Sequence, residues 1–284
     1  MMALIRSLLF VPGNRPDRFH KALASEADLI CIDLEDAVPL AEKDTAFSAV
    51  QSFLSTLDPA QRNRVVVRIN PLSTQLGECE LAGFSACPPA YLMLAKCQST
   101  EEVERAVRAL QGRSKLIGLI ESLSGLMQAA EIARSSKSLV ALMFGGADLA
   151  AELGCDFSYE PLLLARCQLV QAAALAGVQL LDVPFVDLQD QEALQQETRQ
   201  VRALGFTGKA AIHPKQVQLI HQALQPNSEQ LVYAKKVVAA AFSDSAEAVL
   251  VVDGKMVDRP VVLTCQRILA YAGEDSSDGI SSQH

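Results

Sequence analysis

The stretch from Lys115 to Leu149 reads KLIGLIESLSGLMQAAEIARSSKSLVALMFGGADL and contains two apolar runs that each lead to a carboxylate. The first run, residues 116–120, is followed by Glu121, and the second, residues 139–144, leads through two glycines and an alanine to Asp148. Short apolar runs bounded by small or turn residues are typical of strands buried on both faces in a parallel sheet. The segment between them, Leu123–Arg134, is rich in helix formers, and a strand–helix–strand crossover places both strand ends on one face of the sheet. We therefore expect Glu121 and Asp148 to lie side by side.

The same alternation of strand and helix continues along the chain. Eight strands are predicted, over residues 7–11, 29–32, 64–69, 91–95, 115–120, 139–144, 178–181 and 209–212. Helices are predicted between most of them, including residues 41–57, 101–110, 161–176 and 191–204. Eight such units in a chain of 284 residues predict an α/β fold, a (β/α)8 TIM barrel over residues 1–225.

A small C-terminal appendage is predicted over residues 226–272. It consists of a helix over 228–242, a hairpin over 249–257 whose turn is Asp253-Gly254, and a helix over 261–272. This appendage could act as a lid over its own barrel or pack on a neighbouring subunit. Residues 273–284 are rich in Ser, Asp and Gly, so we expect a disordered tail.

The amino-acid composition restricts the classes of function that the protein could have. A formal net charge of −8 argues against nucleic acid or an anionic membrane surface as the main partner. Seven scattered cysteines with no Cys-x-x-Cys pair are typical of a reduced, cytoplasmic protein. Neither a signal peptide nor an apolar stretch of membrane-spanning length is found in the sequence. We therefore expect a cytoplasmic protein that acts on a small molecule.

Polar and charged residues follow every predicted strand, at the end of a barrel where active sites lie. In chain order these are Asn14, Arg15, Asp33, Glu35, Asp36, Arg68, Lys96, Glu121, Asp148, Asp182 and His213. Two carboxylates beside open positions suit Mg²⁺, although either could be a solvated loop acid. The guanidinium fork of Arg68 suits a carboxylate or an enolate, and it could also form a salt bridge with Asp33 or Glu35. His213 could be an acid or base, or only a hydrogen-bonded residue at the strand end.

Seven segments, in order along nearly the whole chain, resemble the citrate lyase β-subunit-like family of Mg²⁺-dependent acyl-CoA lyases. They are Arg6–Gly13, Asp33–Val38, Val67–Asn70, Gly118–Ser122, Phe144–Leu149, Ala211–Pro214 and Val252–Met256. The resemblance implies a TIM-barrel enzyme that cleaves or forms carbon–carbon bonds through enolates. It also implies a CoA thioester or acyl-carrier thioester as substrate, and a homo-oligomer, commonly a trimer.

Roles for individual residues follow from this resemblance. Glu121 and Asp148 would bind Mg²⁺, Arg68 would hold the substrate carboxylate and the enolate oxygen, and Glu35 and Asp36 would orient these groups or a water. Three further residues, Asn14, Arg15 and Lys96, are assigned to binding of the CoA arm. The family often has Glu where this chain has Ala147, a difference that could alter the substrate preference.

Three functions stay open at this point. The favoured one is a freestanding lyase that cleaves (S)-citramalyl-CoA to acetyl-CoA and pyruvate, with malyl-CoA, giving acetyl-CoA and glyoxylate, as the next substrate. The second is the β subunit of a citrate lyase complex that acts on citryl-acyl carrier protein. The third is a non-catalytic barrel that serves as a scaffold. A metal-dependent 2-keto acid aldolase is disfavoured because it would need a catalytic His near an early strand end, and His20 is poorly placed.

Overall fold

The structure is a computed structural model that describes residues 4–243 and 250–273. Within these residues the chain divides into two compact units: one is Ile5–Ala223, and the other is Leu4 together with the part from Leu224 onward. The tail predicted to be disordered, 273–284, lies outside the described residues except for Gly273. None of the described helices is long and apolar enough to cross a membrane.

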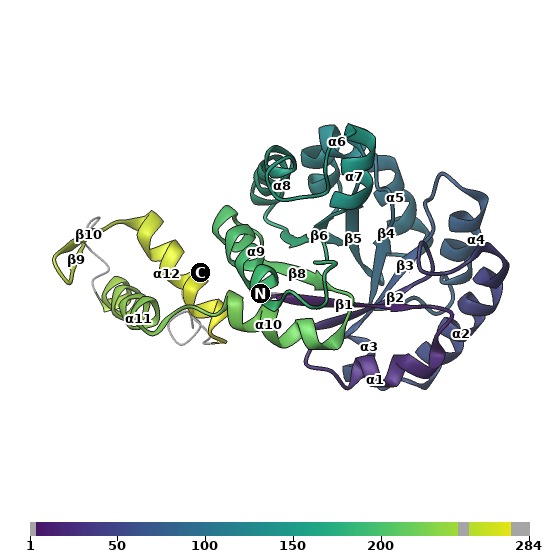
Figure 1. Ribbon diagram of the computed structural model, residues 1–284, viewed down its shortest axis with the longest axis horizontal. Helices are drawn as coiled ribbons and strands as arrows, with labels where there is room; N and C mark the ends of the chain where they lie inside the picture. The colour runs from purple at the N-terminus through teal and green to yellow at the C-terminus, as the bar shows by residue number, and fades with distance from the viewer. Residues whose placement is uncertain (1–3, 244–249, 274–284) are drawn as a thin grey trace. The chain divides into compact units, whose positions relative to one another are not determined.

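Eight parallel strands form a closed barrel in the first unit (Figure 1). They are β1 (Ser7–Pro12), β2 (Leu29–Asp33), β3 (Val65–Ile69), β4 (Tyr91–Leu94), β5 (Lys115–Ile120), β6 (Leu139–Phe144), β7 (Gln179–Asp182) and β8 (Gly208–Ala211). Each strand pairs with the next in the sequence, and β8 pairs with β1 through Leu8 and Ala210. The prediction of a (β/α)8 barrel is confirmed, with every strand within two residues of its predicted bounds.

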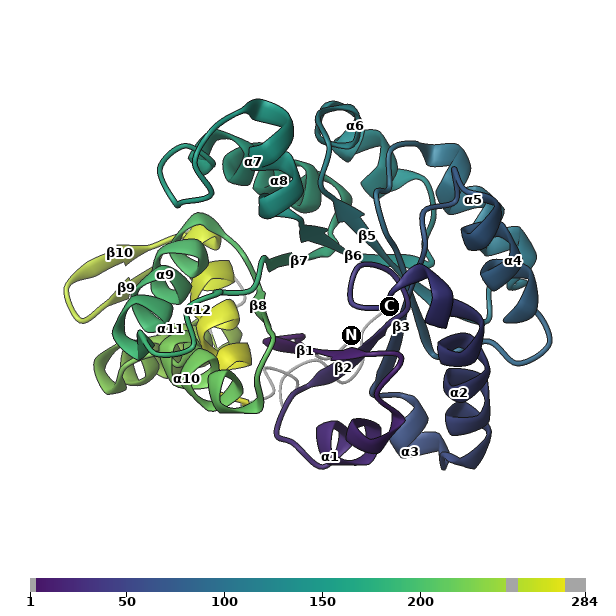
Figure 2. The ribbon, with the colours of Figure 1, turned by 45° about the vertical axis from the view of Figure 1, so that its right-hand side comes forward.

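Helices lie around the outside of the barrel (Figure 2). They are η1 (Pro16–Arg18), α1 (Phe19–Leu23), η2 (Leu40–Glu42), α2 (Lys43–Thr56), α3 (Pro59–Arg62), α4 (Gln75–Gly83), α5 (Thr100–Ala109), α6 (Leu123–Arg134), α7 (Gly146–Leu153), α8 (Leu163–Ala176), α9 (Gln191–Leu204) and α10 (Pro214–Leu224). Helices α3, α4, α7 and α10 were not among the predicted elements. The short helix α7 matters for the site, because it places Asp148 in a first helical turn rather than in a loop.

The strands of the barrel are apolar because both of their faces are covered. Side chains of β2 and β3 are buried along the whole length of each strand, as expected for a sheet with helices on one face and the barrel interior on the other. Buried side chains of the helices pack against this layer, for example Val50 of α2 and Leu169 of α8, both fully buried. The apolar strand sequence is therefore a direct consequence of the barrel architecture.

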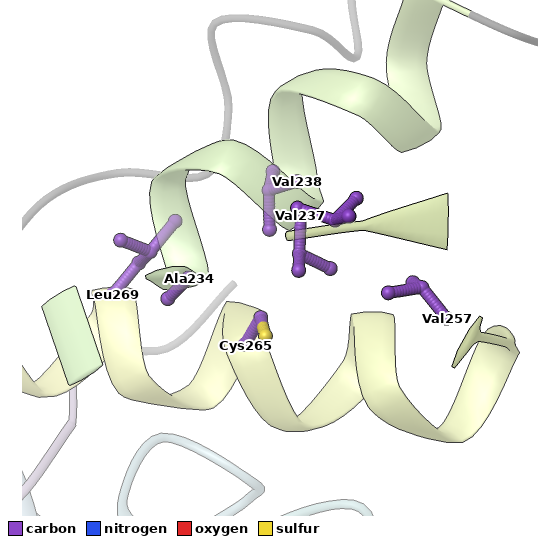
Figure 3. Close-up of a cluster of buried hydrophobic side chains, with 7 residues drawn as sticks. Ala234, Val237, Val238, Val257, Cys265 and Leu269 are labelled. Atoms are coloured by element: carbon purple, nitrogen blue, oxygen red, sulfur yellow. The ribbon is translucent and has the colours of Figure 1, made fainter. Parts of the chain in front are cut away.

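The second unit contains α11 (Ser228–Ser243), β9 (Leu250–Val252), β10 (Lys255–Val257) and α12 (Arg259–Tyr271). Strands β9 and β10 form the predicted antiparallel hairpin. Its turn residues Asp253 and Gly254 have φ of 50° and 75°, and two consecutive positive φ angles are the requirement of a type I′ turn. A separate apolar core holds this unit together (Figure 3): Ala234, Val237, Val238, Val252, Val257, Cys265 and Leu269. Whether this unit acts as a lid stays a prediction.

Candidate active site

A cavity of about 410 Å³ opens at the carboxyl ends of the barrel strands. Its polar lining comes from the ends of β2, β3 and β5 and from the first turn of α7: Asp33, Asp36, Arg68, Glu121 and Asp148. Five of the predicted strand-end residues therefore face a single space. Parallel strands bring this about, because their carboxyl ends all meet at the same edge of the barrel.

Arg68 lies at the centre of a buried charge cluster. Its Nε and Nη2 donate to the two carboxylate oxygens of Asp33 over 2.7 and 2.6 Å, and its Nη1 lies 2.9 Å from Oε2 of Glu35. Asp36 is further away, with Oδ2 at 3.9 Å from Nη1. Burial would lower the pKa of Arg68, but the hydrogen bonds and charges of Asp33 and Glu35 raise it, so the guanidinium stays charged. The salt bridge considered from the sequence is present with Asp33 and with Glu35.

Glu35 is buried behind Arg68 and does not line the cavity. Burial raises the pKa of Glu35 to about 7, opposed by the charge of Arg68 and assisted by Asp36 and Asp33. Its Oε2 is in ion-pair contact with Arg68 but has no hydrogen-bond partner of suitable geometry among the described residues. Glu35 is thus placed to hold Arg68 in position rather than to touch a molecule in the cavity.

A second buried network supports the loop that carries Asp33 and Glu35. The ammonium group of Lys43 donates to the carbonyl oxygens of Leu34 and Glu35, each over 2.6 Å, and to Oδ1 of Asn70 over 3.0 Å. Glu80 accepts from the backbone N–H and the side-chain amide of Asn70, each over 2.7 Å. Lys43 and Glu80 belong to helices, where charged residues are usually solvated, and sequence reasoning missed both of them.

Glu121 is held by backbone on two sides. Its Oε1 accepts from the backbone N–H of Lys96 over 2.7 Å, and Gly145 packs so closely that an added Cβ there would lie 2.2 Å from Cβ of Glu121. Its Oε2 forms no hydrogen bond with the described residues. Burial raises the pKa of Glu121 to about 8, opposed by the Lys96 N–H and assisted by the charge of Glu35. The carboxylate is therefore fixed in position and largely desolvated.

Asp148 completes the polar lining next to Glu121. Its Oδ2 lies 3.6 Å from the ammonium nitrogen of Lys96, and both side chains are about two-fifths exposed. Lys96 itself has a left-handed backbone, with φ of 48°, so that its N–H is directed at Glu121 while its side chain reaches Asp148. A single residue thus contacts both carboxylates.

The residues present fit a Mg²⁺ ion. Within the described residues no group of three or more His, Cys, Asp or Glu side chains could hold a metal, so a site here would rest on two carboxylates. Mg²⁺ is commonly bound by one or two carboxylates and keeps waters or substrate oxygens in its remaining positions. Burial and the neighbouring carboxylates Glu35 and Asp148 raise the pKa of Glu121, and a divalent cation at this site would favour its ionised form.

Some predicted site residues are directed away from the cavity. The side-chain amide of Asn14 donates to Glu42 over 2.7 Å, and Arg15 forms an exposed salt bridge with Asp17 at 2.8 Å. Neither residue lines the cavity, although the adjacent Phe10, Val11 and Pro12 do. A contact of Asn14 and Arg15 with CoA stays a prediction.

Asp182 and His213 also differ from the expected ring of polar strand ends. Asp182 is fully buried and pairs with Arg166 at 3.0 Å and with Lys209 at 2.5 Å. His213 accepts a hydrogen bond from the backbone N–H of Lys215 at the start of α10, and it does not line the cavity. These contacts favour the second sequence interpretation of His213, that of a hydrogen-bonded residue at the strand end.

Apolar side chains form most of the cavity wall, and the sequence did not identify them as part of the site. They include Phe10, Val11, Leu119, Met143, Phe144, Val183 and Ile212. The Phe10 ring lies 5.1 Å from the guanidinium carbon of Arg68. These residues lie in or next to buried strands, so from sequence alone they cannot be told apart from core residues.

Comparison with known proteins agrees with this geometry. The model of the HpcH/HpaI aldolase/citrate lyase family matches residues 6–214, and that of a carbon–carbon bond lyase of the TIM-barrel fold matches residues 170–270. The chain belongs to the HpcH/HpaI aldolase/citrate lyase family. The resemblance to citrate lyase β-subunit-like proteins is thereby confirmed, and so is the prediction of an enzyme of the carbon–carbon lyase type.

Three similar proteins cover nearly the whole chain. Citrate lyase subunit beta of Haemophilus influenzae is 33% identical over 95% of this chain and 98% of its own length. The (3S)-malyl-CoA thioesterase of Cereibacter sphaeroides is 33% identical over 94% of each chain. The crystal structure of protein CitE from Mycobacterium tuberculosis in complex with magnesium, acetoacetate and coenzyme A has a TM-score of 0.81 and 34% identity, and the match covers 96% of this chain and 99% of that one. Proteins with different named activities are thus similar to this chain along nearly its whole length.

Proposed function

We propose that this protein is a Mg²⁺-dependent carbon–carbon lyase that cleaves the CoA thioester of a 3-hydroxy diacid. The favoured substrate is (S)-citramalyl-CoA, which would give acetyl-CoA and pyruvate, and malyl-CoA is the next. One observation carries the proposal: Arg68, Glu121 and Asp148 line a single cavity at the carboxyl ends of the strands. The magnesium, acetoacetate and coenzyme A bound to the M. tuberculosis relative support it.

Glu121 and Asp148 are the residues that would hold Mg²⁺. When bound there, the ion would supply a Lewis acid for the hydroxyl and carboxylate oxygens of the substrate. The protein contributes a rigid site, since Lys96 N–H and Gly145 fix Glu121 and the first turn of α7 fixes Asp148. Two protein ligands leave room for substrate oxygens, which a lyase of this kind requires.

Arg68 would stabilise the charge that develops on the substrate. Asp33 occupies Nε and one hydrogen of Nη2, and Glu35 lies against Nη1, which leaves one N–H on each terminal nitrogen for an oxygen in the cavity. A guanidinium held in this way can bind a carboxylate or an enolate oxygen without reorganising during the reaction. We assign Glu35 to positioning Arg68.

Asp36 is the carboxylate that we assign to proton transfer. It lines the cavity, its side chain is 63% exposed, and it lies near Arg68 without a close salt bridge. In the cleavage, a base takes the hydroxyl proton as the carbon–oxygen bond becomes a carbonyl. The electrons of the broken carbon–carbon bond form the thioester enolate, and a proton delivered to its carbon gives acetyl-CoA. Asp36 could accept the first proton and return it.

The apolar walls support the preference for citramalyl-CoA. Leu119, Met143 and Ile212 line the cavity together with the small side chain of Ala147. Such a surface favours a substrate with a methyl group on the hydroxyl-bearing carbon, by about 1 kcal/mol for one buried methyl. Malyl-CoA lacks this methyl group and would bind less tightly.

Two other activities deserve a direct comparison. The C. sphaeroides relative is a (3S)-malyl-CoA thioesterase, so hydrolysis of the thioester is a second candidate reaction. The H. influenzae relative is a citrate lyase subunit beta, so citryl-acyl carrier protein within a complex is a candidate substrate. A non-catalytic scaffold is the least favoured function, because Arg68, Glu121 and Asp148 are all present and face one cavity.

The deciding experiment measures the products formed by the purified protein alone, with Mg²⁺ or with EDTA. Citramalyl-CoA, malyl-CoA and citryl-CoA are compared, with Glu121→Ala as the inactive control. We expect Mg²⁺-dependent formation of acetyl-CoA, fastest from citramalyl-CoA. Free CoA together with the intact hydroxy acid would instead identify a thioesterase. Absence of turnover on every CoA ester would reject the freestanding enzyme and direct the test to citryl-acyl carrier protein.

The assembly and the CoA contacts belong to the same proposal. We propose a cytoplasmic homotrimer, in which Asn14, Arg15 and Lys96 contact the CoA arm and the C-terminal unit covers a barrel mouth. Sedimentation analysis tests the trimer. An Arg15→Ala variant with a raised KM for the CoA ester and an unchanged kcat would support the CoA contact.

A further inference from the structure

A second cavity, of about 430 Å³, lies at the opposite end of the barrel from the candidate active site. Its lining includes three cations, Arg62, Arg113 and Lys115, together with Cys87 and Tyr91. Lys115 is the first residue of β5, whereas Glu121 directly follows the last residue of that strand. The two cavities are therefore separated by the length of β5.

The charge of this second cavity has a single sign. No acidic residue lines it, and within the described part of the chain none of the three cations forms a salt bridge. The whole chain carries a net charge of −8, so three cations without an acidic partner in one concave site are unlike its average surface. A concave site lined by charges of one sign concentrates the field and raises the local concentration of oppositely charged ligands.

The cations are held in place by uncharged acceptors. Arg62 donates through Nη2 to Sγ of Cys87 and to the carbonyl oxygen of Pro88, and Arg113 donates to the carbonyl oxygens of Leu110 and Ser85. The ammonium group of Lys115 lies 3.3 Å from the hydroxyl of Tyr91. These contacts leave Nη1 of both arginines, Nε of Arg62 and two ammonium hydrogens of Lys115 without an acceptor among the described residues.

We propose that this basic cavity, formed by Arg62, Cys87, Tyr91, Arg113 and Lys115, is a second ligand site that binds a phosphate-bearing anion. Two guanidinium groups and an ammonium group match an anion that carries at least two charges spread over several oxygens. The volume of about 430 Å³ lies in the range of small-molecule sites and admits more than a single phosphate group. Binding there requires neither Mg²⁺ nor a thioester, so it is independent of the proposed lyase activity.

Cys87 provides a local probe of this site. Its thiol is exposed and contacts Arg62, so an anion bound by Arg62 would cover the thiol and repel its thiolate form. Cys79 is a matched internal control, because it is also exposed but belongs to α4 and does not line the cavity. Ligand binding should therefore slow alkylation of Cys87 and leave that of Cys79 unchanged.

The test uses the full chain in EDTA with inorganic pyrophosphate as the probe. Alkylation of each cysteine by iodoacetamide is followed by peptide mass spectrometry, with sulfate and succinate at matched ionic strength for comparison. We expect pyrophosphate to slow alkylation of Cys87 at least fivefold, and sulfate and succinate to do so less. In Lys115→Gln and Arg113→Gln, the pyrophosphate concentration that gives half of the full protection should rise about tenfold. Lys137→Gln is the control, because it changes an exposed lysine outside the cavity, and it should behave as the unmodified protein.

Three results would overturn the proposal: no protection of Cys87, equal protection by all three anions, or unchanged protection in Lys115→Gln. Equal protection would indicate only screening of the thiolate by salt. Lys115→Gln should retain the thermal unfolding midpoint and the basal catalytic rate, because its side chain is exposed and belongs to neither the catalytic nor the metal-binding machinery.

Discussion

The backbone N–H of Lys96 donates to Oε1 of Glu121 over 2.7 Å, while the ammonium group of the same lysine lies 3.6 Å from Oδ2 of Asp148. Lys96 therefore contributes in two opposite ways to the proposed metal site. Its backbone positions one carboxylate, and its side-chain charge compensates the other. Because a divalent cation would compensate the same charge, the ammonium group and the metal compete for Asp148.

Lys96→Met separates these two contributions, because it removes the ammonium group and keeps the backbone N–H. We expect the affinity for Mg²⁺ to rise about two- to fivefold, the amount that a partly exposed ion pair provides. Titration calorimetry measures the change, with Lys137→Met as a control for the general loss of a positive charge. An affinity that falls in Lys96→Met would contradict the competition and would instead indicate that the ammonium group supports the site.

Gly145 is predicted to be essential for metal binding because of its closeness to Glu121. An added Cβ would lie 2.2 Å from Cβ of Glu121, so Gly145→Ala must displace the carboxylate. We expect the Mg²⁺ affinity to fall at least tenfold and turnover to fall with it. Gly154→Ala is the control, since its φ of 67° makes alanine strained while no atom lies within 4 Å of the added Cβ. That variant should lose some stability and keep its Mg²⁺ affinity.

The raised pKa of Glu121 predicts a pH-dependent metal affinity. Mg²⁺ requires the ionised carboxylate, so below pH 8 each unit of pH should weaken the apparent affinity up to tenfold. Titrations at pH 6, 7 and 8 test this, and Glu121→Gln should show weak binding that no longer depends on pH in this way. Equal affinities of the unmodified protein at pH 6 and pH 8 would mean that Glu121 is already ionised at pH 6.

The same pKa has a consequence for the stability of the metal-free protein. Because burial raises the pKa of Glu121 from 4.5 to about 8, the folded state binds this proton more tightly than the unfolded state between these values. The free energy of unfolding contributed by Glu121 should therefore fall as the pH rises from about 4.5 to about 8. Urea unfolding in EDTA at several pH values measures it as the difference between the unmodified protein and Glu121→Gln. If the contribution of Glu121 to the free energy of unfolding instead rose over this pH range, the pKa of Glu121 would be lowered in the folded state.

Arg68→Lys tests whether the guanidinium fork is required. Lysine keeps the charge but cannot donate to both oxygens of Asp33 and also reach Glu35 and a substrate oxygen. We expect kcat to fall by about 10² to 10³, as for the loss of one well-placed electrostatic stabiliser, with the Mg²⁺ affinity unchanged. Steady-state kinetics and calorimetry on the same sample distinguish this from a general collapse of the site, in which both quantities would fall.

The strand ends show how far sequence reasoning reaches. The apolar runs predicted all eight strands, because a strand covered on both faces must be apolar along its length. The carboxylates that end β2 and β5 face the cavity as expected, but Asp182 at the end of β7 pairs with Arg166 and Lys209 instead. The difference depends on the direction in which one side chain points. The register of the barrel determines this direction, and the position of a residue at a strand end does not predict it.

The contacts of individual side chains explain the other differences between the predicted and the observed site. Asn14 and Arg15 follow β1 and so belong to the correct end of the barrel, yet nearby carboxylates bind them outside the cavity. Lys43 lies ten residues beyond Asp33 on a helix, and only the folded chain brings it beneath the loop. Local periodicity therefore predicts which end of the barrel a residue occupies, whereas its hydrogen-bond partners decide whether it joins the site.

Lys43 is the residue whose loss should couple stability to activity. Lys43→Met leaves the carbonyl oxygens of Leu34 and Glu35 and the amide oxygen of Asn70 without their shared donor in a buried site. We expect the free energy of unfolding to fall by about 2 to 4 kcal/mol, the range for several buried polar groups that lose a partner. The loop carrying Asp33 and Glu35 should also loosen, so kcat should fall even under conditions where the variant is fully folded.

Urea unfolding and kinetics at low temperature measure the two effects, with Lys21→Met on the exposed face of α1 as the control. A folded Lys43→Met protein with unchanged kcat would show that Arg68 keeps its position without this support.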